Sequence, residues 1–182
     1  MSQQYPSWER KSRRVLVDTP YMRVYEDVVL LPTGDTIDYT VVNMPSGVVV
    51  VATDSNDRLI VQYEYKYAIN KTILNLPSGS MDKGESVLAA AKRELLEETG
   101  YESNEFEVVQ TLYEYPSKAD HLIYIVRATN AKKVKEVVHE VTENISPVIL
   151  LLPDDKDYDG VFDTTYNVSA IALTLPNFLH KS

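Results

Sequence analysis

No cysteine occurs anywhere in the 182 residues of the sequence. A disulfide framework, a thiolate metal site and a cysteine nucleophile are therefore excluded. The sequence also lacks any run of about 18 apolar residues, so no membrane-spanning helix is expected. Basic residues are few: 18 Lys plus Arg stand against 27 Asp plus Glu, for a formal net charge of −9. This acidity argues against nucleic acid as a partner, because nucleic-acid binding depends on neutralising phosphates.

Hydrophobic residues make up 44% of the sequence and charged residues 25%, which is ordinary for a soluble globular protein and excludes wholesale disorder. The length suits one domain, or one domain with a short extension. Residues 1–14 lack the apolar segment of a secretory signal, so a cytoplasmic location is expected. The same residues carry four basic side chains against Glu9, which indicates either a solvated basic arm or part of an anion site on a partner subunit.

Short segments rich in Val, Leu and Tyr dominate the first third of the chain and predict a series of strands. These segments are Arg13–Asp18, Tyr21–Leu31, Thr36–Met44, Val48–Ala52 and Arg58–Tyr65. Residues 32–35, Pro-Thr-Gly-Asp, predict a hairpin turn between the second and the third. The unbroken apolar run at Val48–Ala52 is typical of a strand that is buried on both faces.

Helical spacing replaces the strand pattern between Glu85 and Thr99, and Gly100 follows where a glycine commonly ends a helix. Further segments predict two strands, a charged loop, an apolar stretch and a terminal helix that Pro176 bends or ends. They are Phe106–Tyr115, Leu122–Ala128, Lys132–Asn144, Val148–Leu152 and Asn167–Leu179. The order predicts an α/β (α+β) fold in which helices sandwich a mixed sheet.

Three acidic residues near the end of the predicted helix are electrostatically unfavourable where they stand. Glu94, Glu97 and Glu98 share one helix face, and they lie at the pole where the helix dipole favours cations. Arg93, four residues before Glu97, offsets only part of this repulsion. The cluster is either a solvated acidic face or the binding site of a divalent cation such as Mg²⁺ or Mn²⁺, which prefers oxygen ligands.

The segment before the helix favours the metal hypothesis. Residues 76–85 form a predicted loop with two glycines, which let a backbone turn sharply and let a carbonyl approach a ligand. A loop carbonyl and the carboxylates of the helix could therefore converge on one metal cluster.

These residues together resemble the motif of the Nudix hydrolases. Gly79, then Glu85, then the run Arg93–Tyr101 (Arg-Glu-Leu-Leu-Glu-Glu-Thr-Gly-Tyr) match that motif in residue type and spacing. The resemblance implies a Nudix-like α/β/α sandwich that hydrolyses a nucleoside diphosphate linked to another group. It also implies that Mg²⁺, with Mn²⁺ as a substitute, is the cofactor.

The resemblance also assigns roles to single residues. Four of them would bind metal: Glu94, Glu97, Glu98 and the carbonyl oxygen of Gly79. Glu85 and Arg93 would hold the loop and the helix in register, with Arg93 orienting a metal-binding glutamate. Gly100 would end the helix as a structural residue of the motif.

Several further segments resemble the ADP-ribose pyrophosphatase branch of the family. They include Leu59–Tyr67, Leu76–Gly79 and Pro116, which stands sixteen residues after Gly100. Lys66 stands where this branch usually has an arginine near the phosphates, and Tyr65 belongs to a group of tyrosines that could stack on adenine or simply pack in the sheet. Lys66, Tyr65 and Pro116 are therefore the candidate substrate-binding residues. Asn75 stands where a glutamate is common in the branch.

The general base of such enzymes often lies on a loop before the last strand, so Glu140 and Glu143 are its candidates here. Glu143 is preferred because Glu143-Asn144 resembles the pattern of the branch. A solvated loop carboxylate is the alternative for either residue. With Arg93 and Glu97, these two complete the predicted catalytic set.

The leading hypothesis is metal-dependent hydrolysis of ADP-ribose or a related nucleoside diphosphate sugar, giving a nucleoside monophosphate and a sugar phosphate. The alternatives are hydrolysis of another nucleoside diphosphate derivative, such as a dinucleoside polyphosphate, and a catalytically silent nucleotide-sugar sensor. Residues 1–46 are expected to form an N-terminal antiparallel β-region that makes a homodimer, and residues 47–182 the hydrolase domain. No membrane partner is expected.

Overall fold

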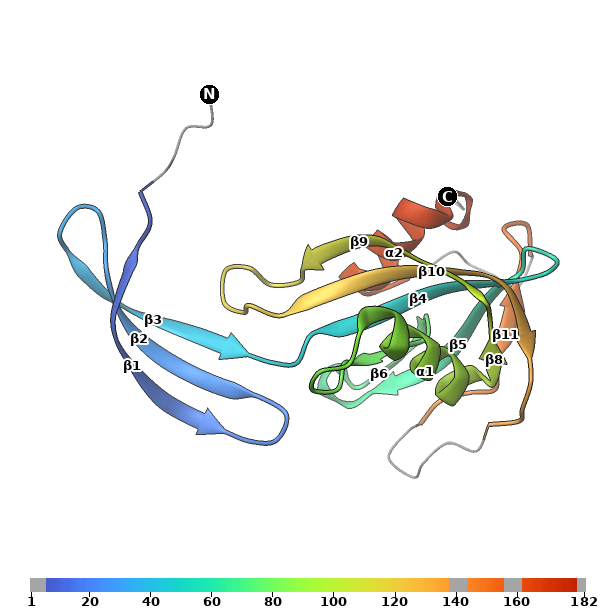
Figure 1. Cartoon of the computed structure of the whole chain (residues 1–182), viewed down its shortest axis with the longest axis horizontal. Helices are drawn as coiled ribbons and strands as arrows, with labels where there is room; N and C mark the ends of the chain where they lie inside the picture. The colour runs from blue at the N-terminus through green and yellow to red at the C-terminus, as the bar shows by residue number, and fades with distance from the viewer. Residues whose placement is uncertain (1–5, 138–143, 156–161, 180–182) are drawn as a thin grey trace. The chain divides into compact units, whose positions relative to one another are not determined.

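The structure is a computed structural model that describes residues 6–137, 144–155 and 162–179 (Figure 1). The chain forms two compact units. The first comprises Met1–Pro45 and Tyr113–His121, and the second comprises Ser46–Leu112 and Leu122–Ser182. Within the described ranges, no helix is both long and apolar enough to cross a membrane.

The first unit is built on a three-stranded antiparallel sheet with the order β1-β2-β3. Its strands are β1 (Glu9–Asp18), β2 (Arg23–Leu30) and β3 (Thr36–Asn43). The predicted turn closes the β2–β3 hairpin, where Gly34 has a φ of +93° and donates its N–H to the carbonyl of Leu31. Segment Tyr113–His121 joins β3 through the Val42 N–H, which donates to the Lys118 carbonyl at 2.7 Å.

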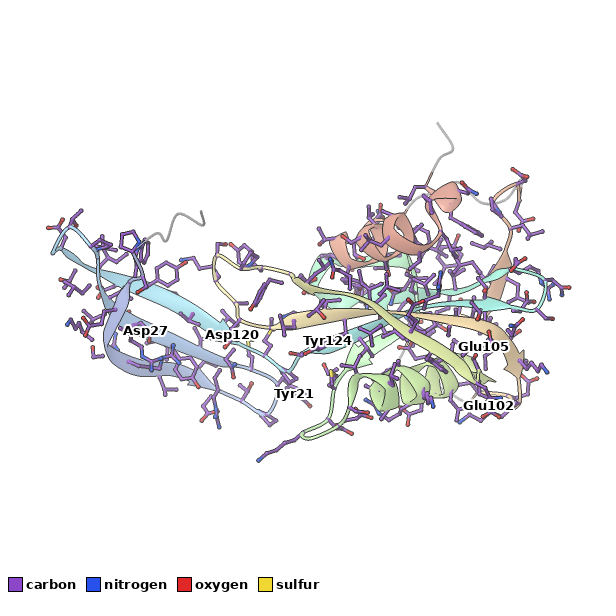
Figure 2. All side chains as sticks on the ribbon, turned by 45° about the horizontal axis from the view of Figure 1, so that its top comes forward. Tyr21, Asp27, Glu102, Glu105, Asp120 and Tyr124 are labelled. Atoms are coloured by element: carbon purple, nitrogen blue, oxygen red, sulfur yellow. The ribbon has the colours of Figure 1, made fainter. Side chains whose placement is uncertain are left out.

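One ion pair between an exposed arginine and a buried aspartate connects β1 to β2. The Arg13 guanidinium donates to both carboxylate oxygens of Asp27 at 2.7 Å, and Asp27 is only 4% exposed. This contact lowers the pKa of Asp27. All ten positions of β1 are nevertheless exposed, and Tyr21 in the following turn is 83% exposed (Figure 2).

The second unit is built on an eight-stranded mixed sheet whose main path runs β11-β5-β4-β10-β8. Strands β4 and β10 are parallel, whereas β6 and β7 pair antiparallel with β5 and β4, and β9 pairs with β10. The strands are β4 (Gly47–Asp54), β5 (Leu59–Lys66), β6 (Lys71–Asn75), β7 (Ser78–Ser80), β8 (Tyr101–Glu102), β9 (Glu105–Tyr113), β10 (Leu122–Lys133) and β11 (Ile149–Leu151).

Helices cover both faces of this sheet. They are α1 (Val87–Thr99) and α2 (Thr165–Thr174), with short 3₁₀ turns at Tyr67–Ile69 and Pro176–Phe178. Alternate residues of β4 belong to opposite cores: Val49 and Val51 pack in the core that includes α2, and Val50 packs in the core that includes α1. All eight residues of β4 are buried. The predicted α/β/α sandwich with a mixed sheet is therefore confirmed, and so is the burial of Val48–Ala52 on both faces (Figure 1).

Three predicted segments differ from the observed elements. The segment before α1 was predicted to be a loop, but Ser78–Ser80 forms β7 because it pairs with Gly47–Val49 of β4. Strand β10 continues beyond Ala128 to Lys133, because Asn130 adopts a φ of +55° and pairing with β4 resumes at Ala131. The terminal helix α2 begins at Thr165, two residues before the predicted start at Asn167, and it ends at Thr174, just before Pro176, as predicted.

Candidate active site

Helix α1 presents the candidate site, and its ends are set by two neighbouring residues. The Ser86 side chain accepts a hydrogen bond from the Ala89 N–H at 3.3 Å, which satisfies one of the free donors of the first turn. At the other end Gly100 has a φ of +73° and its N–H donates to the Leu96 carbonyl. The helix therefore begins two residues after the predicted start at Glu85 and ends as predicted.

Arg93 joins the loop before α1 to the glutamates on the helix. Its Nε and Nη2 donate to the two carboxylate oxygens of Glu85 at 3.0 and 2.9 Å. Nη2 also donates to the Ser80 carbonyl at 3.0 Å. Nη1 donates to Glu94 at 2.7 Å and to Glu97 at 3.2 Å. These contacts use all five N–H donors of a guanidinium. They raise the pKa of Arg93, chiefly through Glu85, and the same pair lowers the pKa of Glu85.

Glu94 is buried against the backbone of Gly79. A Cβ atom placed on Gly79 would lie 2.1 Å from Oε1 of Glu94 and 2.5 Å from Oε2, so a side chain at this position would displace that carboxylate. Burial raises the pKa of Glu94, and the charges of Glu97 and Glu85 add to that rise, while Arg93 opposes it. The Glu94 carboxylate thus lies next to Gly79 in β7. The predicted convergence of the Gly79 carbonyl and the helix carboxylates on a metal stays a prediction.

Glu98 is held from the sheet rather than from the helix. Its Oε2 accepts hydrogen bonds from Gln62 Nε2 at 3.1 Å and from the Ser78 N–H at 3.0 Å. Burial raises the pKa of Glu98 well above its ordinary value, and the nearby charges of Glu94 and Glu64 raise it further. A cation at this place would relieve that repulsion.

Each of the three helix glutamates keeps one carboxylate oxygen for a ligand. Arg93 engages Oε1 of Glu94 and Oε2 of Glu97, and Gln62 and Ser78 engage Oε2 of Glu98. Among the residues that the structure describes, no hydrogen bond reaches the other oxygen of any of the three. The atoms left to bind a ligand are thus carboxylate oxygens, which suit a hard divalent cation.

As they stand, however, the described side chains do not gather three Asp, Glu or His residues closely enough to hold a metal ion. Arg93 draws Glu94 and Glu97 to itself, and Gln62 holds Glu98 toward β5. The metal-ligand set of Glu94, Glu97, Glu98 and Gly79 therefore stays a prediction.

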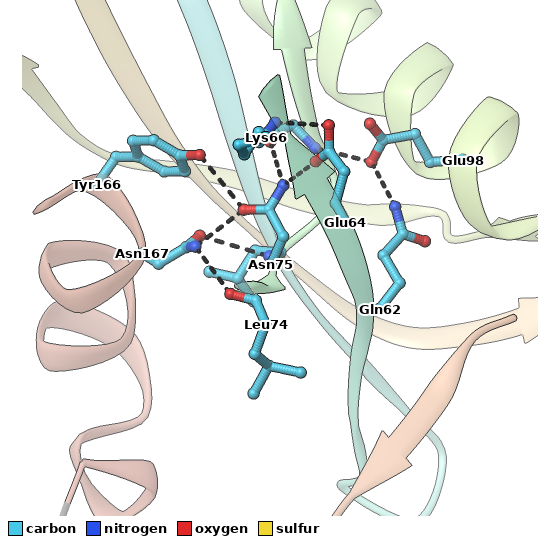
Figure 3. Close-up of polar contacts among 10 residues, drawn as sticks. Gln62, Glu64, Lys66, Leu74, Asn75, Glu98, Tyr166 and Asn167 are labelled. Carbon is cyan, nitrogen blue, oxygen red and sulfur yellow. Dashed lines mark hydrogen bonds and ion pairs between the residues drawn. The ribbon is translucent and has the colours of Figure 1, made fainter. Parts of the chain in front are cut away.

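A second polar group extends the site along β5 and was not found from the sequence. Glu64 accepts a hydrogen bond from Lys66 Nζ at 2.6 Å and from Asn75 Nδ2 at 2.6 Å (Figure 3). Asn75 in turn contacts Asn167 of α2. The alternation of Gln62, Glu64 and Lys66 along one strand was the only sequence signal that could have placed these three side chains on one face.

The other predicted residues are distributed as follows. Lys66 contacts Glu64 on β5. The hydroxyl of Tyr65 donates to the side chain of Asn70 at 2.9 Å. Pro116 belongs to the first unit, so its predicted substrate contact stays a prediction. Glu140 and Glu143 lie outside the described residues. Asn144, the residue after Glu143, accepts a hydrogen bond on its carbonyl from the Tyr65 N–H at 3.0 Å.

A pocket of about 370 Å³ lies beside Glu98. Residues on both sides of the undescribed range 138–143 line it, among them Val137 and Ile145. Of the three helix glutamates, Glu98 alone lines this pocket.

Comparisons with known proteins agree with this geometry. The sequence profile of the NUDIX domain matches residues 44–159, and the chain belongs to this family. It is 32% identical over 112 residues to the methanol dehydrogenase activator of Bacillus methanolicus, covering 62% of this chain and 60% of that protein. It is 29% identical over 113 residues to the ADP-ribose pyrophosphatase of Bacillus subtilis (strain 168), covering 62% and 61%.

A third relative is the ADP-ribose pyrophosphatase of Mycobacterium tuberculosis, 31% identical over 117 residues that cover 63% of this chain and 56% of that protein. The chain thus spans about three fifths of the length of the curated relatives it matches. Among solved structures, an ADP compounds hydrolase superposes with a TM-score of 0.76 at 24% identity, covering 94% of each chain. That likeness establishes the shared fold.

Proposed function

We propose that this chain hydrolyses the diphosphate linkage of ADP-ribose, or of a related nucleoside diphosphate sugar, in a reaction that depends on a divalent metal ion. The observation that carries the proposal is the set of three α1 glutamates, each fixed through one oxygen by Arg93 or Gln62 and each with its other oxygen left for a ligand. The relatives named ADP-ribose pyrophosphatases support this substrate class.

Glu94, Glu97, Glu98 and the Gly79 carbonyl would hold Mg²⁺, with Mn²⁺ as a substitute. When bound, such an ion neutralises charge on the diphosphate and lowers the pKa of a coordinated water. Arg93 keeps Glu94 and Glu97 in place, and Glu98 is kept in place from β5 and β7. The Lys66 ammonium offers a positive charge to the diphosphate as a point contact.

The general base is proposed to be Glu143, with Glu140 as the alternative. The residue after Glu143 is attached to Tyr65, next to Glu64 and Lys66 on β5. A base there would take a proton from water as the water oxygen attacks phosphorus and the bond to the bridging oxygen breaks. The products from ADP-ribose are AMP and ribose 5-phosphate.

The first test is hydrolysis of a panel of nucleoside diphosphate derivatives with Mg²⁺, followed by detection of the released nucleotide. AMP and ribose 5-phosphate are expected from ADP-ribose. Glu97→Gln should lower kcat at least about 100-fold, the scale of losing one preorganised charge-stabilising group. Because the Glu97 side chain is 57% exposed, its substitution leaves the packing of α1 intact.

Glu102→Gln, an exposed carboxylate on β8, is the matched control and should retain full activity. Unchanged turnover in Glu97→Gln would remove the proposed metal role. Binding of ADP-ribose without cleavage would favour a sensor, and cleavage of a dinucleoside polyphosphate alone would favour that substrate. Calorimetric titration with Mn²⁺ provides a readout apart from activity, because Glu97→Gln should weaken metal uptake whereas Glu102→Gln should not.

A homodimer in the cytoplasm is also proposed. Strand β1 is an edge strand whose ten residues are all exposed, including Val15 at 54% and Leu16 at 45%. Unpaired strand edges with apolar side chains readily accept another chain. A second copy of this protein is the proposed partner.

A further inference from the structure

A chain of side-chain amides connects α2 to the candidate site, and the backbone sets its direction. Asn167, in the first turn of α2, is completely buried. Its Nδ2 donates to the Leu74 carbonyl at 3.3 Å, and its Oδ1 accepts from the Leu76 N–H at 3.4 Å. A backbone carbonyl can only accept and a backbone N–H can only donate, so the two ends of the Asn167 amide cannot be exchanged.

The orientation of the Asn167 amide determines the orientation of the Asn75 amide, and Asn75 is also completely buried. Asn167 Nδ2 donates to Asn75 Oδ1 at 2.8 Å, and the Tyr166 hydroxyl approaches the same oxygen at 3.4 Å (Figure 3). Asn75 must therefore turn its Nδ2 toward β5, where it donates to Oε2 of Glu64 at 2.6 Å. Residue 64 consequently has to present an acceptor at this point.

Residue 64 has to present a second acceptor as well. Lys66 Nζ donates to Oε1 of Glu64 at 2.6 Å, and an ammonium has donors only. A carboxylate satisfies two donors at once, whereas an amide would turn its own N–H₂ toward one of them. The sequence Glu64-Tyr65-Lys66 therefore matches a requirement that α2 imposes through two asparagines.

The restrained group is the Lys66 ammonium. Its side chain is 34% exposed and that of Glu64 is 18% exposed, so the pair lies at the boundary between core and solvent. Lys66 alternates along β5 with Gln62 and Glu64, and Gln62 donates to the Glu98 carboxylate at 3.1 Å. Within the described part of the chain, Glu64 is the sole hydrogen-bond partner of Lys66 Nζ, which leaves two of the three ammonium donors for a ligand.

We propose that Glu64 is a positioning residue that fixes the Lys66 ammonium against the diphosphate of the substrate, and that the directed chain from Asn167 through Asn75 requires a carboxylate at position 64. The diphosphate contact rests on the proposed function. The structural part, namely that Glu64 acts through Lys66 and needs Asn75 as a donor, is separate from it.

The test exchanges the acid and the amide between positions 64 and 75. In Glu64→Gln one of two donors faces the new amide nitrogen, and in Asn75→Asp two carboxylates repel each other. In the double variant E64Q/N75D, the amide now at position 64 can donate to the carboxylate now at position 75 and still accept from Lys66. That carboxylate in turn still accepts from Asn167. The double variant therefore restores both the hydrogen-bond pattern and the net charge.

Each single variant should raise the KM for ADP-ribose and the Kd for ADP with Mg²⁺ by about 10- to 100-fold, the worth of one hydrogen bond to a charged group, with little change in kcat. The double variant should return both constants to within roughly threefold of wild type. Wild-type constants in both single variants, or a double variant as weak as the worse single one, would overturn the proposal. Glu107→Gln, which loses an exposed ion pair with Arg127, is the matched control.

A second comparison tests whether Glu64 acts through Lys66, and it remains possible if Asn75→Asp fails to fold. If Glu64 acts only through Lys66, Glu64→Gln combined with Lys66→Met should weaken ADP binding no more than Lys66→Met alone. Additive losses would show an independent role for Glu64 and overturn the proposal. ADP binding by calorimetry does not depend on turnover, so a wild-type protein that leaves ADP-ribose intact would refute the proposed function without deciding the role of Glu64.

Discussion

At the scale of single residues, Gly79 shows that a glycine can be required for space rather than for backbone conformation. It lies in β7 in a regular pairing with Val48, and the Glu94 carboxylate occupies the place of the missing side chain. Arg93 holds the same carboxylate by donating to its Oε1 at 2.7 Å. An added atom at position 79 would therefore force the Glu94 carboxylate to leave its place beside Arg93.

Gly79→Ala should accordingly displace the Glu94 carboxylate while leaving the fold in place. Since a displacement of about 1 Å at a reacting group can cost about 100-fold in rate, we expect a loss of that order in kcat for ADP-ribose. Circular dichroism should show an unchanged melting temperature to within a few degrees.

Ser80→Ala is the control for this substitution, because Arg93 contacts only the backbone carbonyl of that residue. It should retain the activity of the wild type. A Gly79→Ala protein as active as the control would show that Glu94 is not needed where the structure places it.

At the scale of elements, α1 depends on the residue that ends it. Gly100 has a left-handed φ of +73°, and a Cβ at this position would lie 2.2 Å from the Lys135 carbonyl oxygen. The Gly100 carbonyl also accepts from the Val134 N–H at 2.8 Å, so the end of α1 is attached to the chain that leaves β10. The carboxylates at the end of α1 therefore rely on a junction between two elements.

Gly100→Ala should lower the free energy of unfolding by at least about 2 kcal/mol, because a left-handed conformation costs an L-residue about 1–2 kcal/mol and the backbone contact adds to it. Gly84→Ala is the matched control: its φ is +83°, but no atom lies within 4 Å of the added Cβ. The free energy of unfolding of Gly84→Ala should fall by about 1 kcal/mol. Urea unfolding of both variants measures the difference, and equal losses would show that the contact with Lys135 is relieved at no cost.

The sequence predicted those elements whose structure is determined by residues close together in the chain. The extent of α1 follows from its spacing and from Gly100, and the burial of Val48–Ala52 follows from its composition. Strand β7 was missed because Pro77 and Gly79 favour a loop, and its conformation comes from pairing with β4. The group of Glu64, Asn75 and Asn167 was missed for a similar reason, since it joins β5, β6 and α2 across large separations in sequence.

At the scale of the whole molecule, the two units differ in how their surfaces are covered. The sheet of the second unit has helices on both faces, whereas β1 of the first unit has ten exposed residues at the edge of a three-stranded sheet. A small sheet needs a covered hydrophobic face, or packing against another element, to be stable on its own. Association of two copies through β1 would supply it.

Light scattering should accordingly give twice the mass of one chain for the wild type. Val15→Lys combined with Val17→Lys should shift the mass toward that of one chain, because charges on an edge strand oppose strand pairing. Val108→Lys places one such charge on β9 at a position of similar exposure, 42% against 41% for Val17, and should leave the dimer intact. A wild type that is monomeric at all concentrations would contradict the proposal.

The first unit is discontinuous in sequence, and this limits how the protein can be divided or exchanged. A gene fragment that starts at residue 46 would still encode Tyr113–His121. In that fragment the Lys118 carbonyl would lose the hydrogen bond that it accepts from the Val42 N–H in the whole chain. Recombination between relatives would have to transfer both stretches together to keep them matched. The N-terminal sheet and the segment Tyr113–His121, which lies more than sixty residues further along the chain, are therefore expected to change together in evolution.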